Sequence, residues 1–478
     1  MATAIQEHHN LSGLIVSDFR ETLYTVDSAG NRKWVYPTII FGSHYKQRVV
    51  VGTCLLFIYL VTPWITIGNH QAVQLDIPGR RLIAFGQIFW ATDTIFLMLI
   101  LFGLGLSLFF FTALLGRVWC GWACPETVFL EYLFRPIENL IEGSAATRRK
   151  LDQSPWSLRK VRIKLTKYGV FSILSWIIAS TTLAYFVGRE ALFEMMCHSP
   201  LQNLPTFLAT LFIMVVVLFQ FGWFREQFCT VICPYARFQS VLMDQDSLLV
   251  GYDAIRGEPR GKASNPNNDK KGDCVDCGLC IRVCPTGIDI RNGTQLECVH
   301  CASCIDACNS IMTKVGRPLG LIRYATEHEL MGESHPTLAK RLFRPRILLY
   351  SSLFFLLALA WVFFLSTREL SEVQLLRRGG GSTFTITDDG KISNLIQLHF
   401  SNKSEETLSY LVQTEEKDLT LTVAVSPFTL GPGEMGVLPI FAAFPRESLH
   451  GGKRTAKIVV TDGKGFSRPI EVSFLGPE

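Results

Sequence analysis

Residues 96–115 read FLMLILFGLGLSLFFFTALL, a run without a single charged side chain. About 20 apolar residues in an α-helix span the hydrocarbon core of a bilayer. The other interpretation is a helix buried in the core of a soluble protein, and periodicity alone does not separate the two. We favour a membrane-spanning helix because the run is long and uninterrupted.

The composition of the whole chain agrees with this interpretation. The 478 residues suffice for about three domains. Apolar residues make up 48%, charged residues 18%, and the mean hydropathy is +0.26. Ordinary soluble and disordered proteins fit these values poorly, whereas a membrane protein with soluble parts attached fits them well. The net charge of +5 is too small to indicate nucleic acid, and we expect no such partner.

Four more apolar runs are long enough to cross a bilayer, at residues 49–67, 168–187, 204–224 and 347–366. Lys and Arg accumulate on the cytoplasmic side of membranes. Ten of them lie between the second and third spans, whereas the loops on the opposite side carry only Arg80, Arg81 and Arg189. We therefore predict that the N-terminus and residues 225–346 are cytoplasmic and that the C-terminal tail is outside.

Eight of the fourteen cysteines form two runs of equal spacing, Cys274-x2-Cys277-x2-Cys280-x3-Cys284-Pro285 and Cys298-x2-Cys301-x2-Cys304-x3-Cys308. Two-cluster bacterial ferredoxins have this spacing, and the fourth cysteine of each run ligates the other cluster. Zinc is the alternative, but zinc sites usually use separate C-x2-C pairs. We predict two [4Fe–4S] clusters, one held by Cys274, Cys277, Cys280 and Cys308 and the other by Cys298, Cys301, Cys304 and Cys284.

Two further cysteine pairs repeat each other along the chain. Cys120-x3-Cys124-Pro125 follows the second span, and Cys229-x3-Cys233-Pro234 follows the fourth. We predict that two similar helical hairpins pack side by side and bring these four thiolates together at the cytoplasmic face. Thiolates select Cu(I), zinc or iron–sulfur clusters. Redox chemistry of a dithiol, or simple packing of small apolar side chains, stays open.

Other residues allow two interpretations each. Asp93, at the outer edge of the second span, either relays protons or binds an ion, or it caps the helix. Residues 195–198, Met-Met-Cys-His, either receive copper on the outer side through their sulfur and nitrogen ligands, including Cys197 and His198, or are ordinary loop residues. His300, inside the second cysteine run, is expected to tune a cluster by hydrogen bonding. The apolar face of residues 125–143 indicates either an interfacial helix or a packed surface helix.

The region after residue 379 alternates between apolar and polar residues in around seven short stretches. This pattern predicts a β-sandwich, although the region lacks the Cys and Trp of antibody domains. The predicted fold is a mainly α-helical membrane protein with an inserted α+β two-[4Fe–4S] ferredoxin domain and a C-terminal all-β sandwich. The predicted segments are an N-terminal segment at 1–47, four transmembrane helices at 48–228 with a loop at 116–167, a ferredoxin-like domain at 229–346, a fifth transmembrane helix at 347–367 and an Ig-like sandwich at 379–478.

These features together resemble the cytochrome c oxidase accessory protein family CcoG, also called FixG or RdxA. The stretch YDAIRGEPRGK at residues 252–262 and the stretch RKWVYP at residues 32–37 are similar to signatures of that family. The resemblance extends over nearly the whole chain. The paired C-x3-C-P motifs alone would not be specific, because other membrane ferredoxins share them.

The resemblance implies a cupric reductase of the bacterial inner membrane that supplies Cu(I) for assembly of a cbb3-type cytochrome oxidase. It implies copper as a transient or substrate ion beside the two clusters. It also implies a cytoplasmic electron donor, and a copper chaperone or oxidase subunits as partners. The ferredoxin domain would be cytoplasmic and the sandwich periplasmic. Cys120, Cys124, Cys229 and Cys233 would then be the copper-handling or electron-exit residues.

Two other functions stay open at this point. The chain could be a quinol- or flavin-linked electron conduit, or an assembly scaffold whose clusters are structural. The sequence does not identify the electron donor or the side on which copper is released. It also leaves the oligomeric state open, including a homodimer.

Overall fold

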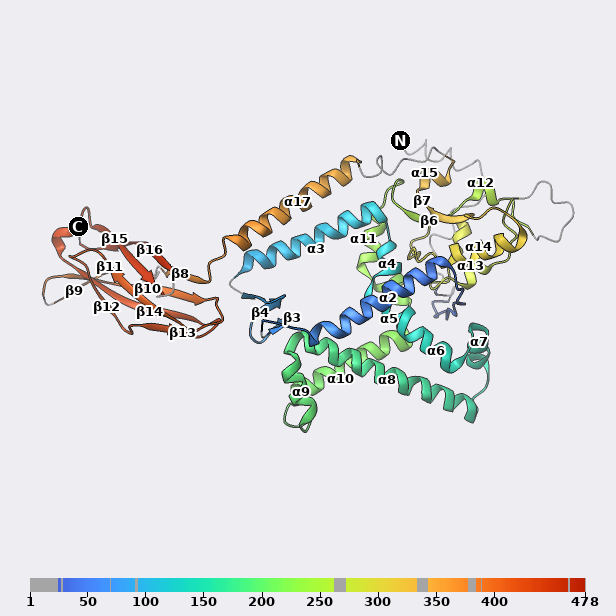
Figure 1. The fold of residues 1–478 in the computed structure, drawn as a ribbon, viewed down its shortest axis with the longest axis horizontal. Helices are drawn as coiled ribbons and strands as arrows, with labels where there is room; N and C mark the ends of the chain where they lie inside the picture. The colour runs from blue at the N-terminus through green and yellow to red at the C-terminus, as the bar shows by residue number, and fades with distance from the viewer. Residues whose placement is uncertain are drawn as a thin grey trace. The chain divides into compact units, whose positions relative to one another are not determined.

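The computed structural model describes residues 25–26, 29–68, 70–90, 93–261, 272–332, 343–376, 384–387, 389–462 and 465–477. Residues 1–24 of the predicted N-terminal segment and residues 379–383 of the predicted sandwich lie outside them. The chain forms two compact units, whose elements are labelled in Figure 1. Unit 1 comprises Met1–Gly79, Ile83–Gly86 and Met98–Ala358, and unit 2 comprises Arg80–Leu82, Gln87–Leu97 and Leu359–Glu478.

Five helices of the described residues are long and apolar enough to cross a membrane. They are α2 (Ser43–Val61) with the short turn η2 (Thr62–Trp64), α3 (Thr94–Leu115), α8 (Leu158–Val187), α10 (Leu204–Phe219) with the π-helical turn η4 (Gln220–Phe224), and α17 (Pro345–Ser366). The five predicted spans are therefore confirmed as helices that are long and apolar enough to cross a membrane. Many of their large apolar side chains, such as Leu101, Phe212 and Phe355, are exposed in the isolated chain. A helix that is apolar on all sides suits a lipid environment.

Helix α8 begins at Leu158, well before the predicted span at 168–187. Ser157 caps it, because its Oγ accepts a hydrogen bond from the Lys160 N–H at 3.2 Å. The basic residues before the span are thus helical. The predicted loop at 116–167 is also mostly helical, with α4 (Val118–Trp122), α5 (Pro125–Phe129), η3 (Leu130–Phe134), α6 (Arg135–Glu142) and α7 (Ala145–Gln153).

The helical segment after the first C-x3-C-P motif packs against the membrane helices. Phe134 of η3 lies edge-on to Phe171 of α8 at 4.9 Å and is stacked on Phe221 of η4 at 4.8 Å between ring centroids. All three rings are buried. Leu140, which the pattern placed on the same apolar face, is 85% exposed. The apolar face of residues 125–143 therefore packs mostly against the membrane helices, and not on the cysteine-rich domain as the packed-helix alternative expected.

The cysteine-rich segment folds into short helices and one two-stranded ladder. Strand β6 (Leu249–Tyr252) pairs antiparallel with β7 (Ile322–Ala325). Val250, Ile305, Met312 and Ile322 are buried in its core. Its other elements are η5 (Phe228–Ile232), α11 (Pro234–Leu242), α12 (Ala254–Gly257), α13 (Leu279–Arg282), η6 (Ile290–Asn292), α14 (Ser303–Val315) and α15 (Glu327–Leu330). This is the predicted α+β insert.

The connections on the other side of the membrane helices are short. They contain β1 (Thr66–Ile67), β2 (His70–Gln71), β3 (Val73–Asp76), β4 (Arg81–Ala84), β5 (Gln87–Trp90) and α9 (Arg189–Cys197). Gly188, with a φ of +90°, stands between α8 and α9. A positive φ is readily adopted only by glycine, so it allows the chain to turn there.

Unit 2 contains the predicted all-β sandwich. One sheet has the order β12–β14–β10–β8, with β9 also paired to β10, and the other has the order β13–β11–β15–β16. The strands are β8 (Ser371–Leu376), β9 (Thr385–Ile386), β10 (Ile392–Asn402), β11 (Leu408–Thr414), β12 (Thr420–Val423), β13 (Phe428–Leu430), β14 (Met435–Phe444), β15 (Lys453–Thr461) and β16 (Ser467–Leu475), with η7 (Arg446–Ser448) between β14 and β15.

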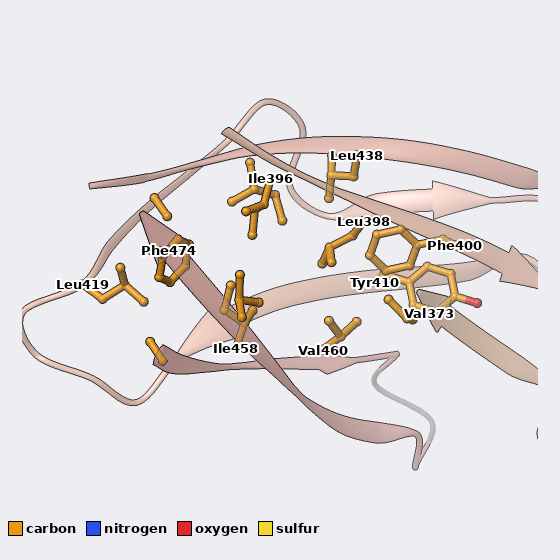
Figure 2. Close-up of a cluster of buried hydrophobic side chains, with 14 of the residues drawn as sticks. Val373, Ile396, Leu398, Phe400, Tyr410, Leu419, Leu438, Ile458, Val460 and Phe474 are labelled. Atoms are coloured by element: carbon orange, nitrogen blue, oxygen red, sulfur yellow. The ribbon is translucent and has the colours of Figure 1, made fainter. Parts of the chain in front are cut away.

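Inward-facing side chains of the two sheets form one core. Figure 2 shows Leu398, Phe400, Tyr410 and Phe474 within it, and all are at most 1% exposed. The sandwich begins at Ser371, not at the predicted residue 379. The reason is that β8 pairs with β10 over six residues, so it belongs to the sheet although it closely follows the last membrane helix.

Candidate metal centres

The eight cysteines of the ferredoxin motifs line two small cavities of about 20 Å³ each. Cys274, Cys277, Cys280 and Cys308 line the first. Cys284, Cys298, Cys301 and Cys304 line the second, together with Cys280. Each predicted ligand set is therefore brought around one cavity, including the crossed fourth cysteine. Four thiols around one cavity are the donor set that a [4Fe–4S] cluster requires, so the residues fit this cofactor.

The two cavities are made by loops of matching backbone conformation. Asp276 and Gly278 in the first run have φ values of +51° and +64°, and His300 and Ala302 in the second have +51° and +61°. Left-handed residues are uncommon outside glycine, so their recurrence at the same two positions marks a structural repeat. The repeat wraps each C-x2-C-x2-C loop around its own cavity.

Burial keeps several of these thiols protonated in the metal-free chain. It raises the pKa of Cys280 and Cys298 to about 12 and that of Cys308 to about 11. Among the described residues, no three His, Cys, Asp or Glu side chains already stand as a site for a single metal ion, and this includes the cysteines of the C-x3-C-P motifs. Because burial keeps these thiols protonated, cluster assembly must remove their protons as iron–sulfur bonds form.

The four C-x3-C-P cysteines line a third cavity of about 30 Å³. Cys124 and Cys233 each stand directly before a proline that occupies the first position of a helix, α5 or α11. Proline is favoured there because it has no N–H to leave unpaired. Cys120 lies in α4 and Cys229 in the π-helical turn η5. The structure thus brings together the two motifs that the sequence repeat predicted to meet.

The electrostatics of this third cavity disfavour charge in the metal-free chain. Burial raises the pKa of Cys120 to about 12 and also raises that of Cys229. It raises the pKa of Cys124 too, although the backbone N–H groups of Glu126 and Thr127 act in the opposite direction. Burial raises the pKa of the Glu126 carboxyl to about 7, and its Oε1 has no partner among the described residues. A soft metal ion would therefore displace protons when it binds.

The third cavity directly adjoins the second. Leu296, Glu297 and Val299, from the loop around the start of the second cysteine run, complete the wall of the four-cysteine cavity. Val299 also lines the second ferredoxin cavity. A β-carbon placed on Gly121 would lie 2.5 Å from the Val299 carbonyl oxygen. Only a residue without a side chain permits this approach.

Arg117 joins the two sites, a role that the sequence alone did not reveal. Its backbone N–H donates to Nδ1 of His300 at 3.2 Å, and its Nε–H donates to Oε1 of Gln239 at 3.2 Å. The Cys120 thiol donates to the same Gln239 oxygen at 3.2 Å. One indication of this role is present in the sequence, because an arginine precedes each C-x3-C-P motif. Arg225, its counterpart, instead binds Glu138 at 2.7 Å.

Buried ion pairs hold this face of unit 1 together. Glu138 binds Arg148, Lys167 and Arg225 at 2.6–2.7 Å. Burial opposes the ionisation of Glu138, but its three cationic partners outweigh burial and lower its pKa. Glu226 binds Arg32 at 3.2 Å, which accounts for the arginine of the RKWVYP stretch.

The remaining candidates from the sequence, Asp93, Cys197 and His198, lie outside the three cysteine-lined cavities. Oδ2 of Asp93 accepts a hydrogen bond from Arg368 at 2.7 Å, and Oδ1 accepts one from Lys403 at 2.6 Å. This carboxylate therefore forms a buried ion pair within unit 2. Cys197 is exposed, and Nδ1 of His198 contacts the Glu194 carbonyl oxygen at 2.8 Å. Met195 is buried and Met196 is exposed, and none of residues 195–198 lines the three cysteine-lined cavities.

Three family models match the chain. Residues 224–327 match one described as a "4Fe-4S dicluster domain", and residues 94–151, which include the first C-x3-C-P motif, match a "4Fe-4S binding domain". Residues 361–477 match an "IG-like fold at C-terminal of FixG", a description that places FixG provisionally among the oxidoreductases.

Relatives match over most of the chain. Protein RdxA of Cereibacter sphaeroides is 36% identical, over 78% of this chain and 80% of that protein. Protein RdxB of the same organism is 34% identical, over 84% and 86%. Nitrogen fixation protein FixG of Rhizobium meliloti is 31% identical, over 92% of both chains.

Proposed function

This chain belongs to the FixG/RdxA family of ferredoxin-type membrane proteins, and from that premise we propose that it reduces Cu(II) to Cu(I) at the four-cysteine cavity. One observation carries the proposal. Val299 lies in the wall of both the second ferredoxin cavity and the four-cysteine cavity. One residue, Val299, therefore connects the wall of the second ferredoxin cavity to the wall of the cavity that holds the C-x3-C-P thiols. An electron that reaches the second ferredoxin cavity would have to pass only this residue.

The chemistry of the cavity suits this reaction. When bound, the two [4Fe–4S] clusters would supply single electrons, and the reduction of Cu(II) to Cu(I) consumes one. Sulfur ligands favour Cu(I). The four cysteines would hold the product once their protons leave, and Gln239 would orient the Cys120 sulfur through its Oε1. Gly121 and Arg117 would keep the ferredoxin loop against the site.

The location and the partners are further parts of the proposal. The distribution of Lys and Arg supports a bacterial inner-membrane protein whose ferredoxin segment faces the cytoplasm and whose sandwich faces the periplasm. Cu(I) would pass to a copper chaperone or to subunits of a cbb3-type oxidase during its maturation. The sandwich would bind that recipient.

The test is anaerobic reduction of Cu(II) by purified protein whose clusters have been reduced chemically. The variant changes Cys120, Cys124, Cys229 and Cys233 to Ser, and Cys197→Ser is the matched control because Cys197 is exposed and does not line the four-cysteine cavity. Cluster oxidation should keep pace with Cu(I) formation in the wild type and the control, and should stall in the quadruple variant. Equal rates in all three proteins would mean nonspecific electron leakage, and would favour the conduit or scaffold functions.

A further inference from the structure

The two ferredoxin loops differ in charge at one equivalent position. The residue before the second cysteine is Asp276 in the first run and His300 in the second. Both residues have a φ of +51°, so their side chains leave the two loops at the same point of the repeat. The surroundings of the two predicted cluster sites can therefore be compared position by position.

Two buried arginines bind the second loop. Arg48 of α2 is 2% exposed, and its Nη1 donates to the Cys301 carbonyl oxygen and to Ser303 Oγ, both at 2.7 Å. Arg117 is 4% exposed, and its Nη1 donates to the Cys298 carbonyl oxygen at 3.4 Å. An arginine side chain keeps its proton in proteins, so both residues bring a permanent positive charge to the second ferredoxin cavity.

Among the described residues, no carboxylate forms an ion pair with either arginine, and their other partners are neutral. Arg48 donates through Nε to the Tyr132 hydroxyl at 2.9 Å. Arg117 donates to Oε1 of Gln239 and to the carbonyl oxygens of Leu296 and Ala236. Hydrogen bonds to neutral groups leave the charge of a guanidinium in place.

Acidic side chains in the same region do not contact these arginines. Glu131 lines a small cavity together with Arg48, but its carboxylate binds Arg135. Asp306 of α14 accepts hydrogen bonds from two backbone N–H groups in the first turn of α2, at 2.8 and 3.3 Å. Glu297 lines the four-cysteine cavity and forms no ion pair among the described residues. The charged groups that directly contact the cysteine carbonyl oxygens of the second loop are therefore cations.

The first cavity has different surroundings. Arg291 lies in its wall and is bound by Asp289 at 2.7 Å and by Asp276 at 2.5 Å, so that one cation meets two carboxylates. Arg282 donates to the Cys277 carbonyl oxygen at 3.3 Å, but its side chain is exposed, and water screens an exposed charge. The first cavity therefore lacks the buried, unpaired cations of the second among the described residues.

This difference in charge bears on the reduction potentials of the two sites. Net charge, hydrogen bonding and exposure to solvent set the potential of an iron–sulfur cluster. A buried cation favours the reduced form, because reduction adds negative charge and little water is present to screen the attraction. We infer that Arg48 and Arg117 raise the reduction potential of the second cluster site above that of the first.

The inferred difference gives the relay a direction. An electron delivered to either site comes to rest at the second, where one site is reduced for each one that is oxidised and no proton moves. The second cavity is also the one that shares Val299 with the four-cysteine cavity. Its role as the exit towards copper rests on the proposed function, whereas the order of the two potentials does not.

The experiment is a redox titration of the full-length, cluster-loaded protein in detergent, without copper, followed by electron paramagnetic resonance. The wild type should show two different midpoint potentials. Arg48→Gln removes the charge and should lower only the higher midpoint, with a roughly tenfold fall in the equilibrium constant for reduction, which is about 59 mV for one electron. Arg48→Lys keeps the charge and should titrate close to the wild type. Arg282→Gln is the matched control, because Arg282 also binds a cysteine carbonyl oxygen but is exposed, and both midpoints should stay unchanged.

Equal midpoints in the wild type, an unchanged titration of Arg48→Gln, or a fall of its lower midpoint would overturn the inference. An equal fall in Arg48→Lys would do the same, because it would assign the effect to lost contacts and not to charge. If Arg48→Gln loses its clusters, Asp276→Asn takes its place, since the Asp276 side chain is 48% exposed. Removal of this carboxylate should raise only the lower midpoint, and a rise of the higher midpoint or of neither contradicts the inference.

The two proposals fail separately. Because the midpoints are measured without copper, equal midpoints refute the direction of the relay and leave Cu(II) reduction untouched. Midpoints in the inferred order, in a protein that does not reduce Cu(II), refute the copper reaction alone.

Discussion

Gly121 and Cys301 belong to different motifs, yet their backbones touch: a β-carbon on Gly121 would lie 2.7 Å from the Cα of Cys301 and 2.8 Å from its N atom. These are contacts with backbone, which cannot turn aside as a long side chain can. The first C-x3-C-P motif therefore packs directly against the loop that lines the second ferredoxin cavity.

Gly121→Ala should separate the two sites without removing any ligand. We expect the rate of Cu(II) reduction to fall by roughly 10- to 100-fold, since small displacements of reacting groups have effects of that size. Cluster content and the number of titratable thiols should stay as in the wild type. Gly169→Ala, at a position where a β-carbon meets nothing within 4 Å, is the control. Wild-type rates in the Gly121→Ala variant would show that this contact does not govern electron transfer.

Copper binding should depend on pH in a defined direction. Burial raises the pKa of Cys120 to about 12 and also raises that of Cys229 and Cys124, so these thiols are protonated near neutrality. Cu(I) must displace their protons, and each proton released weakens binding about tenfold per unit fall in pH. Competition titrations with a Cu(I) chelator between pH 6 and 8 measure this slope. An affinity independent of pH would show that the site binds Cu(I) with thiolates already formed.

Glu138→Gln should destabilise the part of unit 1 in which α6, α7 and α8 meet. The change leaves Arg148, Lys167 and Arg225 without their shared carboxylate, and breaking a buried ion pair costs about 3–5 kcal/mol. A thermal melt of the detergent-solubilised protein should show a lower Tm. Glu190→Gln is the control, because the Glu190 side chain is 90% exposed. An unchanged Tm would mean that water replaces the lost carboxylate.

The stability of the protein in acid should also depend on Glu138. The folded state lowers the pKa of Glu138, because its cationic partners outweigh burial. Its contribution is therefore present above the ordinary pKa of about 4.3 and is lost as the pH falls towards the lower folded value. The Tm of the wild type should drop below this pH more steeply than that of Glu138→Gln. If the Tm of the two proteins falls in parallel as the pH is lowered, other carboxyl groups cause the sensitivity to acid.

Asp93→Ala tests whether that residue serves structure or proton transfer. The change leaves the buried Arg368 without a carboxylate partner, while Lys403 keeps only Glu372 at 2.8 Å. Limited proteolysis should cut the sandwich faster than in the wild type, whereas Cu(II) reduction by chemically reduced protein should continue. Glu471→Gln, at a largely exposed ion pair, is the control. Loss of Cu(II) reduction with an intact sandwich would instead support a proton relay.

Features that depend on neighbouring residues were predictable from the sequence. The five membrane helices follow from the length and apolarity of single segments, and the two cluster loops follow from the spacing of their cysteines. The all-β tail follows from its alternation. The errors are at boundaries: β8 belongs to the sandwich because of its pairing with β10, and α8 begins early because Ser157 caps it.

Contacts between distant residues were decided by the tertiary structure. The repeat of the C-x3-C-P motifs predicted that they meet, but not that Val299 would stand between their cavity and the ferredoxin segment. Nor did it indicate that Arg117 would bind His300. A spacing pattern records which side chains can share one local turn. It carries no information about which backbone, far away in the chain, will pack against that turn, because that choice depends on the shapes of both surfaces once they are folded.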